Sequence, residues 1–283
     1  MFTIQRAVVL LLTAGAAITG MVRSGPADRV TPAGEVDPTR LYDKSQAEYY
    51  LTSEEFQWIR PGLQVEVEDV TIPASRRPVV TMSFTDDLGQ PLDREGVITP
   101  GEVGFSFILS WWDAAEHDYV AYTTRPQTSP ITGDTAIQAS SDSGGTLVDL
   151  GMGRARYTFG TQLPEGYDPT VTHTVGIYAE RDLEDIIEKV YYDNVEYDFR
   201  PDGGEVTDVW AAFDDATCNA CHEQLAFHGG SRRDVKLCVL CHNEQTVDPD
   251  TGNSVDMKVM IHKIHMGANL PSVEAGGTYE IIG

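Results

Sequence analysis

The residues whose types and spacing can do chemistry form two CxxCH motifs near the C-terminal end of the chain. The first motif is Cys218-Asn219-Ala220-Cys221-His222 and the second is Cys238-Val239-Leu240-Cys241-His242. In such a motif the two thiols form thioethers with one porphyrin, and the adjacent histidine binds the iron as the proximal ligand. We therefore expect two covalently bound haem c groups. Their attachment residues would be Cys218, Cys221, Cys238 and Cys241, with His222 and His242 as proximal iron ligands.

A zinc ribbon is the alternative for these cysteines, because two CxxC pairs separated by sixteen residues also suit one tetrahedral ion. A histidine directly follows both pairs, although the sequence has only 7 histidines. The two motifs also use all 4 cysteines of the chain. These observations favour haem over zinc.

Three further histidines, His228, His262 and His265, are candidates for the distal position on a haem iron. A distal histidine makes a haem an electron carrier, whereas an open position would allow a haem enzyme that reduces a small molecule. His262 and His265 share one face of an expected helix, so we expect them to serve different haems. His228 would lie about 240° around a helix from His222, so we expect it to reach a neighbouring haem.

The number of histidines has a consequence for the length of the protein. Two haems need two distal ligands, and three candidates are present. The sequence also stops at an apolar segment, residues 279–283. Both observations predict a fragment, or a subunit that another chain completes, so any further haem would belong to a longer chain or a partner.

The stretch before the motifs, from about residue 63 to residue 199, must position them, and its apolar residues recur every second position. Val65 and Val67 alternate with glutamates. Val195, Tyr197 and Phe199 likewise alternate with acidic residues. Such alternation predicts antiparallel strands with one face in water. The fold class we expect is a mainly β N-terminal domain, an antiparallel split barrel or sandwich. A small, loop-rich, partly α-helical multihaem domain would follow it.

Changes of composition divide the chain into four parts. We expect a signal peptide or N-terminal anchor over residues 1–20, a linker over 21–40, the β domain over 41–203 and the haem domain over 204–283. Short helical segments are expected within 41–59 and 181–189. In the haem domain, one helix would begin at Thr207 or Asp208 and run to Phe227, and another would cover Met257–Met266.

The charge and the N-terminus narrow the partners and the location. Arg6 followed by an apolar stretch is typical of an export signal, which predicts the periplasm, the outer-membrane surface or the extracellular space. The 44 acidic residues outnumber the 20 basic ones and give a net charge of −24. A nucleic-acid partner is therefore not expected, because phosphates are bound by clustered Lys and Arg.

The segment Cys218–Pro271 resembles the outer-membrane multihaem cytochromes of the OmcA/MtrC family. The resemblance rests on residues 218–230, on Asp234–Cys238 and on Met260–Ala268. It implies a split β-barrel domain before a multihaem domain, with His222 and His242 as proximal ligands. His228, His262 and His265 would be distal ligands to various haems.

The same resemblance implies a function. It implies one-electron transfer toward extracellular acceptors, such as metal oxides or flavins, in anaerobic respiration. Other multihaem cytochromes or an outer-membrane porin complex would be partners, and an enzymatic role would be that of an oxidoreductase such as a metal reductase. The chain departs from the family in having two CxxCH motifs rather than ten, and in lacking a lipid-bearing cysteine.

Overall fold

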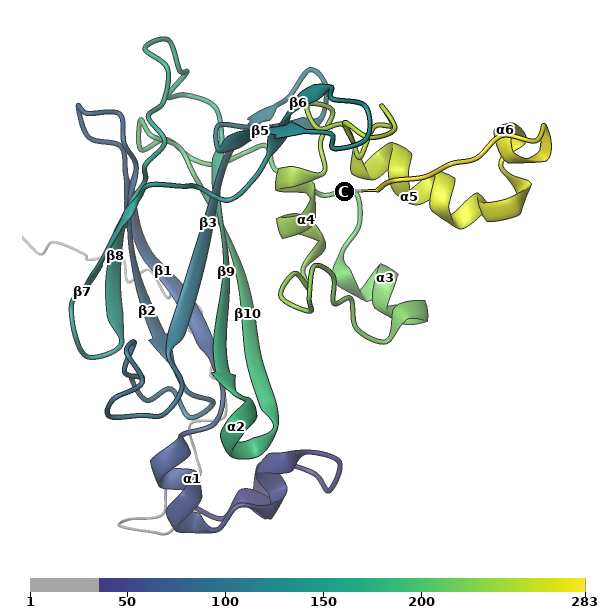
Figure 1. Ribbon diagram of the computed structural model, residues 1–283. Helices are drawn as coiled ribbons and strands as arrows, with labels where there is room; N and C mark the ends of the chain where they lie inside the picture. The colour runs from purple at the N-terminus through teal and green to yellow at the C-terminus, as the bar shows by residue number, and fades with distance from the viewer. Residues whose placement is uncertain (1–35, 283) are drawn as a thin grey trace, which may run out of the picture. The chain divides into compact units, whose positions relative to one another are not determined.

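The computed structural model describes residues 36–282, so the expected signal peptide and most of the expected linker lie outside the described residues. Short helical segments precede the first strand, the strands follow with one short helix between the last two of them, and the remaining helices come last along the chain (Figure 1). The strands are β1 (Gln64–Thr71), β2 (Val79–Thr85), β3 (Val103–Asp113), β4 (Asp118–Ala121), β5 (Thr124–Thr128), β6 (Thr135–Ala139), β7 (Thr146–Asp149), β8 (Arg154–Thr158), β9 (His173–Leu183) and β10 (Lys189–Phe199). The α-helices are α1 (Ser53–Ile59), α2 (Glu184–Ile187), α3 (Asp215–His222), α4 (Val235–Cys241), α5 (Met257–Met266) and α6 (Pro271–Glu274). Three 3-10 turns are η1 (Pro38–Arg40), η2 (Ala47–Tyr50) and η3 (Gly267–Asn269).

The strands form two four-stranded sheets and one two-stranded ribbon. The first sheet has the order β1-β2-β8-β7, the second β10-β9-β3-β4, and the ribbon pairs β5 with β6. Every pairing is antiparallel, which confirms the expected fold class. The two large sheets are arranged as in a sandwich, and within the described residues they do not close into a barrel.

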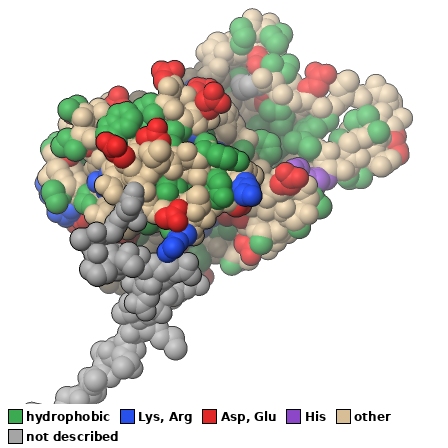
Figure 2. All heavy atoms as spheres, turned by 90° about the horizontal axis from the view of Figure 1, so that it is seen from below, with side chains coloured by type: hydrophobic (Ala, Val, Ile, Leu, Met, Phe, Trp, Pro, Cys, Tyr) green, Lys and Arg blue, Asp and Glu red, His purple; other side chains and the backbone are tan. Residues whose placement is uncertain are grey.

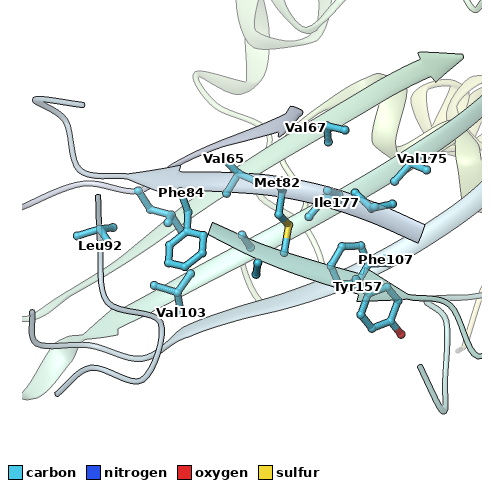
Figure 3. Packing of buried hydrophobic residues seen from close by; sticks show 14 of the residues in the cluster. Val65, Val67, Met82, Phe84, Leu92, Val103, Phe107, Tyr157, Val175 and Ile177 are labelled. Carbon is cyan, nitrogen blue, oxygen red and sulfur yellow. The ribbon is translucent and has the colours of Figure 1, made fainter. Parts of the chain in front are cut away.

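The apolar core lies between these two sheets, as the two-residue period of the sequence predicts. Val65, Met82 and Phe84 of the first sheet and Phe107 and Ile177 of the second belong to one buried cluster (Figure 3). The Phe107 ring stacks on the Tyr157 ring with 3.8 Å between centroids. Burial of such side chains supplies most of the stability of the sandwich.

Arg181 joins the segment before β1 to the sheets. Its side chain is fully buried, and its guanidinium donates to the carbonyl oxygens of Ile59, Arg60, Gly62 and Pro100. These bonds satisfy a charge that burial would otherwise make costly. The short helices expected within 41–59 and 181–189 are confirmed by α1 and α2.

Both faces of strand β3 are buried, whereas the sequence predicts one face in water. Its residues Phe107 and Leu109 enter the sandwich core, whereas Ile108 and Trp112 enter a second buried cluster. That second cluster contains Leu237, Val239 and Leu240 of α4 together with Trp210 and Tyr119. The prediction is wrong here because α4 covers the outer face of the sheet (Figure 1).

The expected helix from Thr207 to Phe227 is wrong at both ends. Residues 205–214 have no helical structure, and α3 begins only after Asp214, whose carboxylate accepts a hydrogen bond from the Thr217 backbone N–H at 3.0 Å. Asp214, and not Thr207 or Asp208, is the N-cap of this helix, because its carboxylate accepts a hydrogen bond from a backbone N–H of the first turn that would otherwise have no partner. The helix ends at His222, where Glu223 takes a positive φ of 60°. Helix α5 covers Met257–Met266 as expected.

Candidate functional site

Helix α4 places the second CxxCH motif against the sheet. Asp234 caps the helix through the Lys236 N–H at 2.8 Å, and Val235, Leu237, Val239 and Leu240 are buried. Asn194 of β10 fixes the approach to this helix, because its side-chain oxygen accepts from the N–H groups of Arg233 and Asp234. Cys238 and Cys241 therefore project from a helix that is firmly held by the β domain.

Helix α3 carries the first motif and is held more loosely. Cys218 is partly exposed and Cys221 and His222 are exposed, and no residue of the helix is buried. Asp215 links the two motifs, because its carboxylate accepts from the Val235 N–H at 2.7 Å. The N-terminal ends of the two attachment helices are thus joined by one hydrogen bond.

Helix α5 carries two of the three candidate distal histidines, His262 and His265. The Nδ1 of His262 donates to the Lys258 carbonyl at 2.5 Å, and the Nδ1 of His265 donates to the Ile261 carbonyl at 2.6 Å. His242, which follows α4, donates in the same way to the Val255 carbonyl at 2.9 Å. A carbonyl can only accept, so each ring keeps its proton on Nδ1 and leaves the Nε2 lone pair available to a metal.

The histidines lie in two facing pairs. The ring centroids of His222 and His265 are 6.0 Å apart, and their planes make an angle of 83°. The ring centroids of His228 and His242 are 5.9 Å apart, with an angle of 32° between the planes. A metal-bound nitrogen lies about 2 Å from the metal and about 1 Å from the centre of its ring, so two histidines on opposite sides of one iron have centroids about 6 Å apart.

Both pairs therefore have the separation that a bis-histidine haem requires, and in each pair one member follows a CxxC. His262 has no partner of this kind among the described histidines. His228 lies beyond the end of α3, so the helical angle that we used for it does not apply.

Burial governs the electrostatics of the second motif. It raises the pKa of the Cys238 and Cys241 thiols to about 12. Burial also lowers the pKa of His242, against the hydrogen bond to the Val255 carbonyl, and Arg232 lowers it further. The pKa of His228 is lowered by burial and then by Arg232. Neutral imidazoles are the form that binds iron, so these shifts suit the expected ligands.

The cysteines do not have the arrangement of a zinc ribbon. In a tetrahedral zinc site four sulfurs surround one ion at about 2.3 Å. In the part of the chain that the structure describes, the one group of candidate metal ligands is Asp118, Glu244 and Asp256, and it contains no cysteine. The donor set around the CxxCH motifs fits haem instead.

Lys258 occupies that acidic group and could not be recognised from the sequence. Its Nζ lies 3.2 Å from Asp118 of β4, 3.5 Å from Glu244 and 4.0 Å from Asp256. An ammonium placed among three carboxylates compensates charges that burial would leave unpaired. The sequence separates Asp118 and Lys258 by 140 residues, so only the fold shows that Lys258 anchors the start of α5.

Histidine side chains reach the surface of the protein, and acidic side chains lie near them on the face in Figure 2. No helix within residues 36–282 is long and apolar enough to span a bilayer.

Comparisons with known proteins point to one family. Residues 211–280 match the family model described as outer membrane cytochrome MtrC/MtrF-like, domains II/IV. The crystal structure of the outer membrane decaheme cytochrome OmcA matches with a TM-score of 0.56 and 22% sequence identity, over 74% of this chain and 33% of that one. The structure of MtrC from Shewanella baltica OS185 has a TM-score of 0.49 and 22% identity, over 75% of this chain and 34% of the other. The chain thus spans about a third of the length of both structures. No curated protein matches it.

Proposed function

We propose that the chain, whose residues 211–280 match the family model of MtrC/MtrF-like outer membrane cytochromes, is an exported multihaem c-type cytochrome that transfers single electrons. Two haem c groups would be attached, one at Cys218 and Cys221 and one at Cys238 and Cys241. Each bound haem would supply an iron that cycles between the ferrous and ferric states.

The observation that carries this proposal is the pairing of the histidine rings. We assign His222 and His265 to the first haem, and His242 and His228 to the second, because each pair has its centroids about 6 Å apart and contains one CxxCH histidine. With both axial positions filled by imidazole, neither iron would offer a site to a substrate. Electron transfer is therefore favoured over a haem enzyme with an open axial position.

The protein's own groups would hold these ligands in place. The carbonyls of Ile261 and Val255 orient His265 and His242 by accepting their Nδ1 protons. Lys258 anchors α5 to β4, and Asn194 anchors the loop that carries His228 by donating to the Ser231 carbonyl at 2.9 Å. The β domain would thus act as the rigid support of the haem segment.

His262 is left for a haem outside the two motifs. It is exposed, and its Nδ1 is already engaged by the Lys258 carbonyl. We propose that it binds the iron of a haem held by another part of a longer chain or by a partner cytochrome. Such a contact would extend the chain of haems toward an outer-membrane porin complex on one side and extracellular acceptors, such as metal oxides or flavins, on the other.

Mass and visible spectra of the protein, expressed with a haem-attachment system, test this function. We expect an intact mass with two added haems and a low-spin spectrum that carbon monoxide does not change. A mass without haem would overturn the proposal and return the cysteines to zinc or to free thiols. A high-spin component that binds carbon monoxide would instead favour the enzyme.

A further inference from the structure

The two CxxCH motifs lie in different electrostatic surroundings. Burial raises the pKa of the Cys218 thiol, and Asp215 and Asp214 raise it further, so carboxylates face the first motif. Cys241 instead faces two guanidinium groups, those of Arg232 and Arg125, which both act to lower its pKa against the larger effect of burial. At the second motif Asp234, Glu196 and Asp215 act on Cys238, so carboxylates lie on the Cys238 side and the guanidinium groups on the side of Cys241 and His242.

Arg232 is held in place on that side by three contacts. Its guanidinium lies over the Tyr178 ring, 4.1 Å from the centroid. Its Nη1 donates to the Ser231 hydroxyl at 3.2 Å and lies 3.4 Å from the His228 carbonyl. The positive charge of Arg232 is therefore held next to His228, which we assign as the distal ligand of the second haem. The tyrosine beneath the guanidinium, Tyr178, belongs to β9.

We propose that Arg232 raises the reduction potential of the haem at Cys238 and Cys241 above that of the haem at Cys218 and Cys221. This inference rests on the proposed function, and it adds a direction to it. An electron that enters at the first motif would move to the second.

The sign follows from charge. A bis-histidine haem gains one positive charge when its iron is oxidised, so a nearby guanidinium disfavours the ferric state and a nearby carboxylate favours it. Packing adds to this, because α4 buries four side chains against the β domain whereas α3 buries none. A less solvated site also disfavours the more charged form. The guanidinium of Arg232 and the packing of α4 both act to raise the potential of the second haem, and they act against the carboxylates beside Cys238.

The angles between the ring planes allow the two haems to be followed separately. Nearly perpendicular imidazole planes give a ferric low-spin electron paramagnetic resonance signal of large anisotropy, and planes closer to parallel give an ordinary rhombic signal. We assign the first type to His222 and His265, at 83°, and the second to His228 and His242, at 32°. A redox titration of the holoprotein that follows each signal gives a potential for each haem.

In the unaltered protein we expect the rhombic signal to disappear at the higher potential. In Arg232→Gln we expect the ratio of reduced to oxidised second haem, at a fixed potential, to fall roughly threefold to tenfold, where tenfold is about 59 mV for one electron. Arg232→Lys should retain most of the potential because it retains the charge.

Arg233→Gln is the matched control. Arg233 also lies over a tyrosine, 4.6 Å from the Tyr192 centroid, and donates to the Gly230 carbonyl at 2.7 Å, whereas the guanidinium that acts on both Cys241 and His242 is that of Arg232. We expect it to leave both potentials in place.

The reverse order of potentials in the unaltered protein would overturn the inference whether or not any variant folds. An equal shift of both haems in Arg232→Gln, or the same shift in Arg233→Gln, would overturn it too. Two low-spin haems with such results would leave the proposed function standing, whereas missing haem would remove both.

Discussion

Gly176 of β9 lies so close to Leu240 of α4 that a Cβ atom at residue 176 would be 2.5 Å from the Leu240 Cδ1. The same Cβ would be 2.8 Å from a methyl group of Leu237. A glycine at this position lets the helix with the second CxxCH motif rest directly on the sheet. The distance between motif and β domain is therefore set by the absence of one side chain.

Replacement of this glycine should loosen the contact. We expect Gly176→Ala to lower the free energy of unfolding by about 1–3 kcal/mol, because an added methyl group overpacks a buried interface. Thermal or denaturant unfolding of the holoprotein measures the change. Gly104→Ala in β3 is the control, since its Cβ would have its nearest neighbour at 3.5 Å. If Gly176→Ala and Gly104→Ala lowered the free energy of unfolding equally, close packing of α4 on Gly176 would not be the cause.

Removal of single histidines should affect the two haems separately. We expect His265→Ala to convert one haem to a high-spin or carbon-monoxide-binding form, and His228→Ala to do so for the other, because each loses one axial ligand. Visible and electron paramagnetic resonance spectra of the reduced and oxidised proteins provide the readout.

His262→Ala serves as the comparison for these two variants. It lies on the same helix as His265 and makes the same type of bond to the carbonyl four residues before it. In this chain alone we expect it to leave both low-spin signals unchanged. Loss of a low-spin haem in His262→Ala would require a different pairing.

Lys258→Met should destabilise the protein, because it leaves Asp118 and Asp256 buried without their cation. Hydrogen bonds to charged groups contribute about 1.5–3 kcal/mol, and the partly exposed ammonium places the expected loss near the lower end. Chemical denaturation checks this value. Addition of Asp118→Asn to Lys258→Met should recover part of the loss, and a double variant that is as unstable as the sum of both changes would speak against the ion pair.

Glu196 makes stability depend on pH. Burial, with a contribution from Asp234, raises the pKa of this carboxyl to about 8, and its Oε1 has no hydrogen-bond partner. The folded protein therefore retains a proton that the unfolded chain releases above about pH 4.3. Stability should fall as the pH rises from there to about 8.

Glu196→Gln removes this dependence and should be more stable than the parent at pH 8 by about 1–3 kcal/mol, with little difference at pH 4. Denaturant unfolding at several pH values shows the trend. The exposed glutamate Glu66 of β1 offers a matched change, Glu66→Gln, which we expect to be neutral. If the difference in unfolding free energy between Glu196→Gln and the parent were the same at all pH values, titration of Glu196 could not be its cause.

The period of two and the CxxCH spacing predicted the main features of this protein. The antiparallel fold class is confirmed, and the family resemblance read from residues 218–271 is confirmed by the match over residues 211–280. Both signals are local, since they depend on residues that are neighbours in the chain.

Other features depend on contacts that no local pattern encodes. The second face of β3 became buried only because α4 packs on it, and helix α3 began at Asp214 because that residue satisfies the backbone N–H of Thr217. Lys258 and Arg232 were not recognised for the same reason: each acts on groups that the fold brings to it. Pairing of the haem ligands stays a prediction, supported by ring separations that the sequence could not supply.

The close packing of α4 also bears on how the protein is made. Cys238 and Cys241 are partly covered once their helix rests on β3 and β9, and thioether formation requires both sulfurs to be reached. Haem attachment at this motif should therefore precede the closing of α4 on the sheet. On α3, which buries no side chain, attachment can follow later. The glycine at position 176 thus couples the covering of the second motif to the docking of α4, and we expect the haem of that motif to be attached before the contact forms.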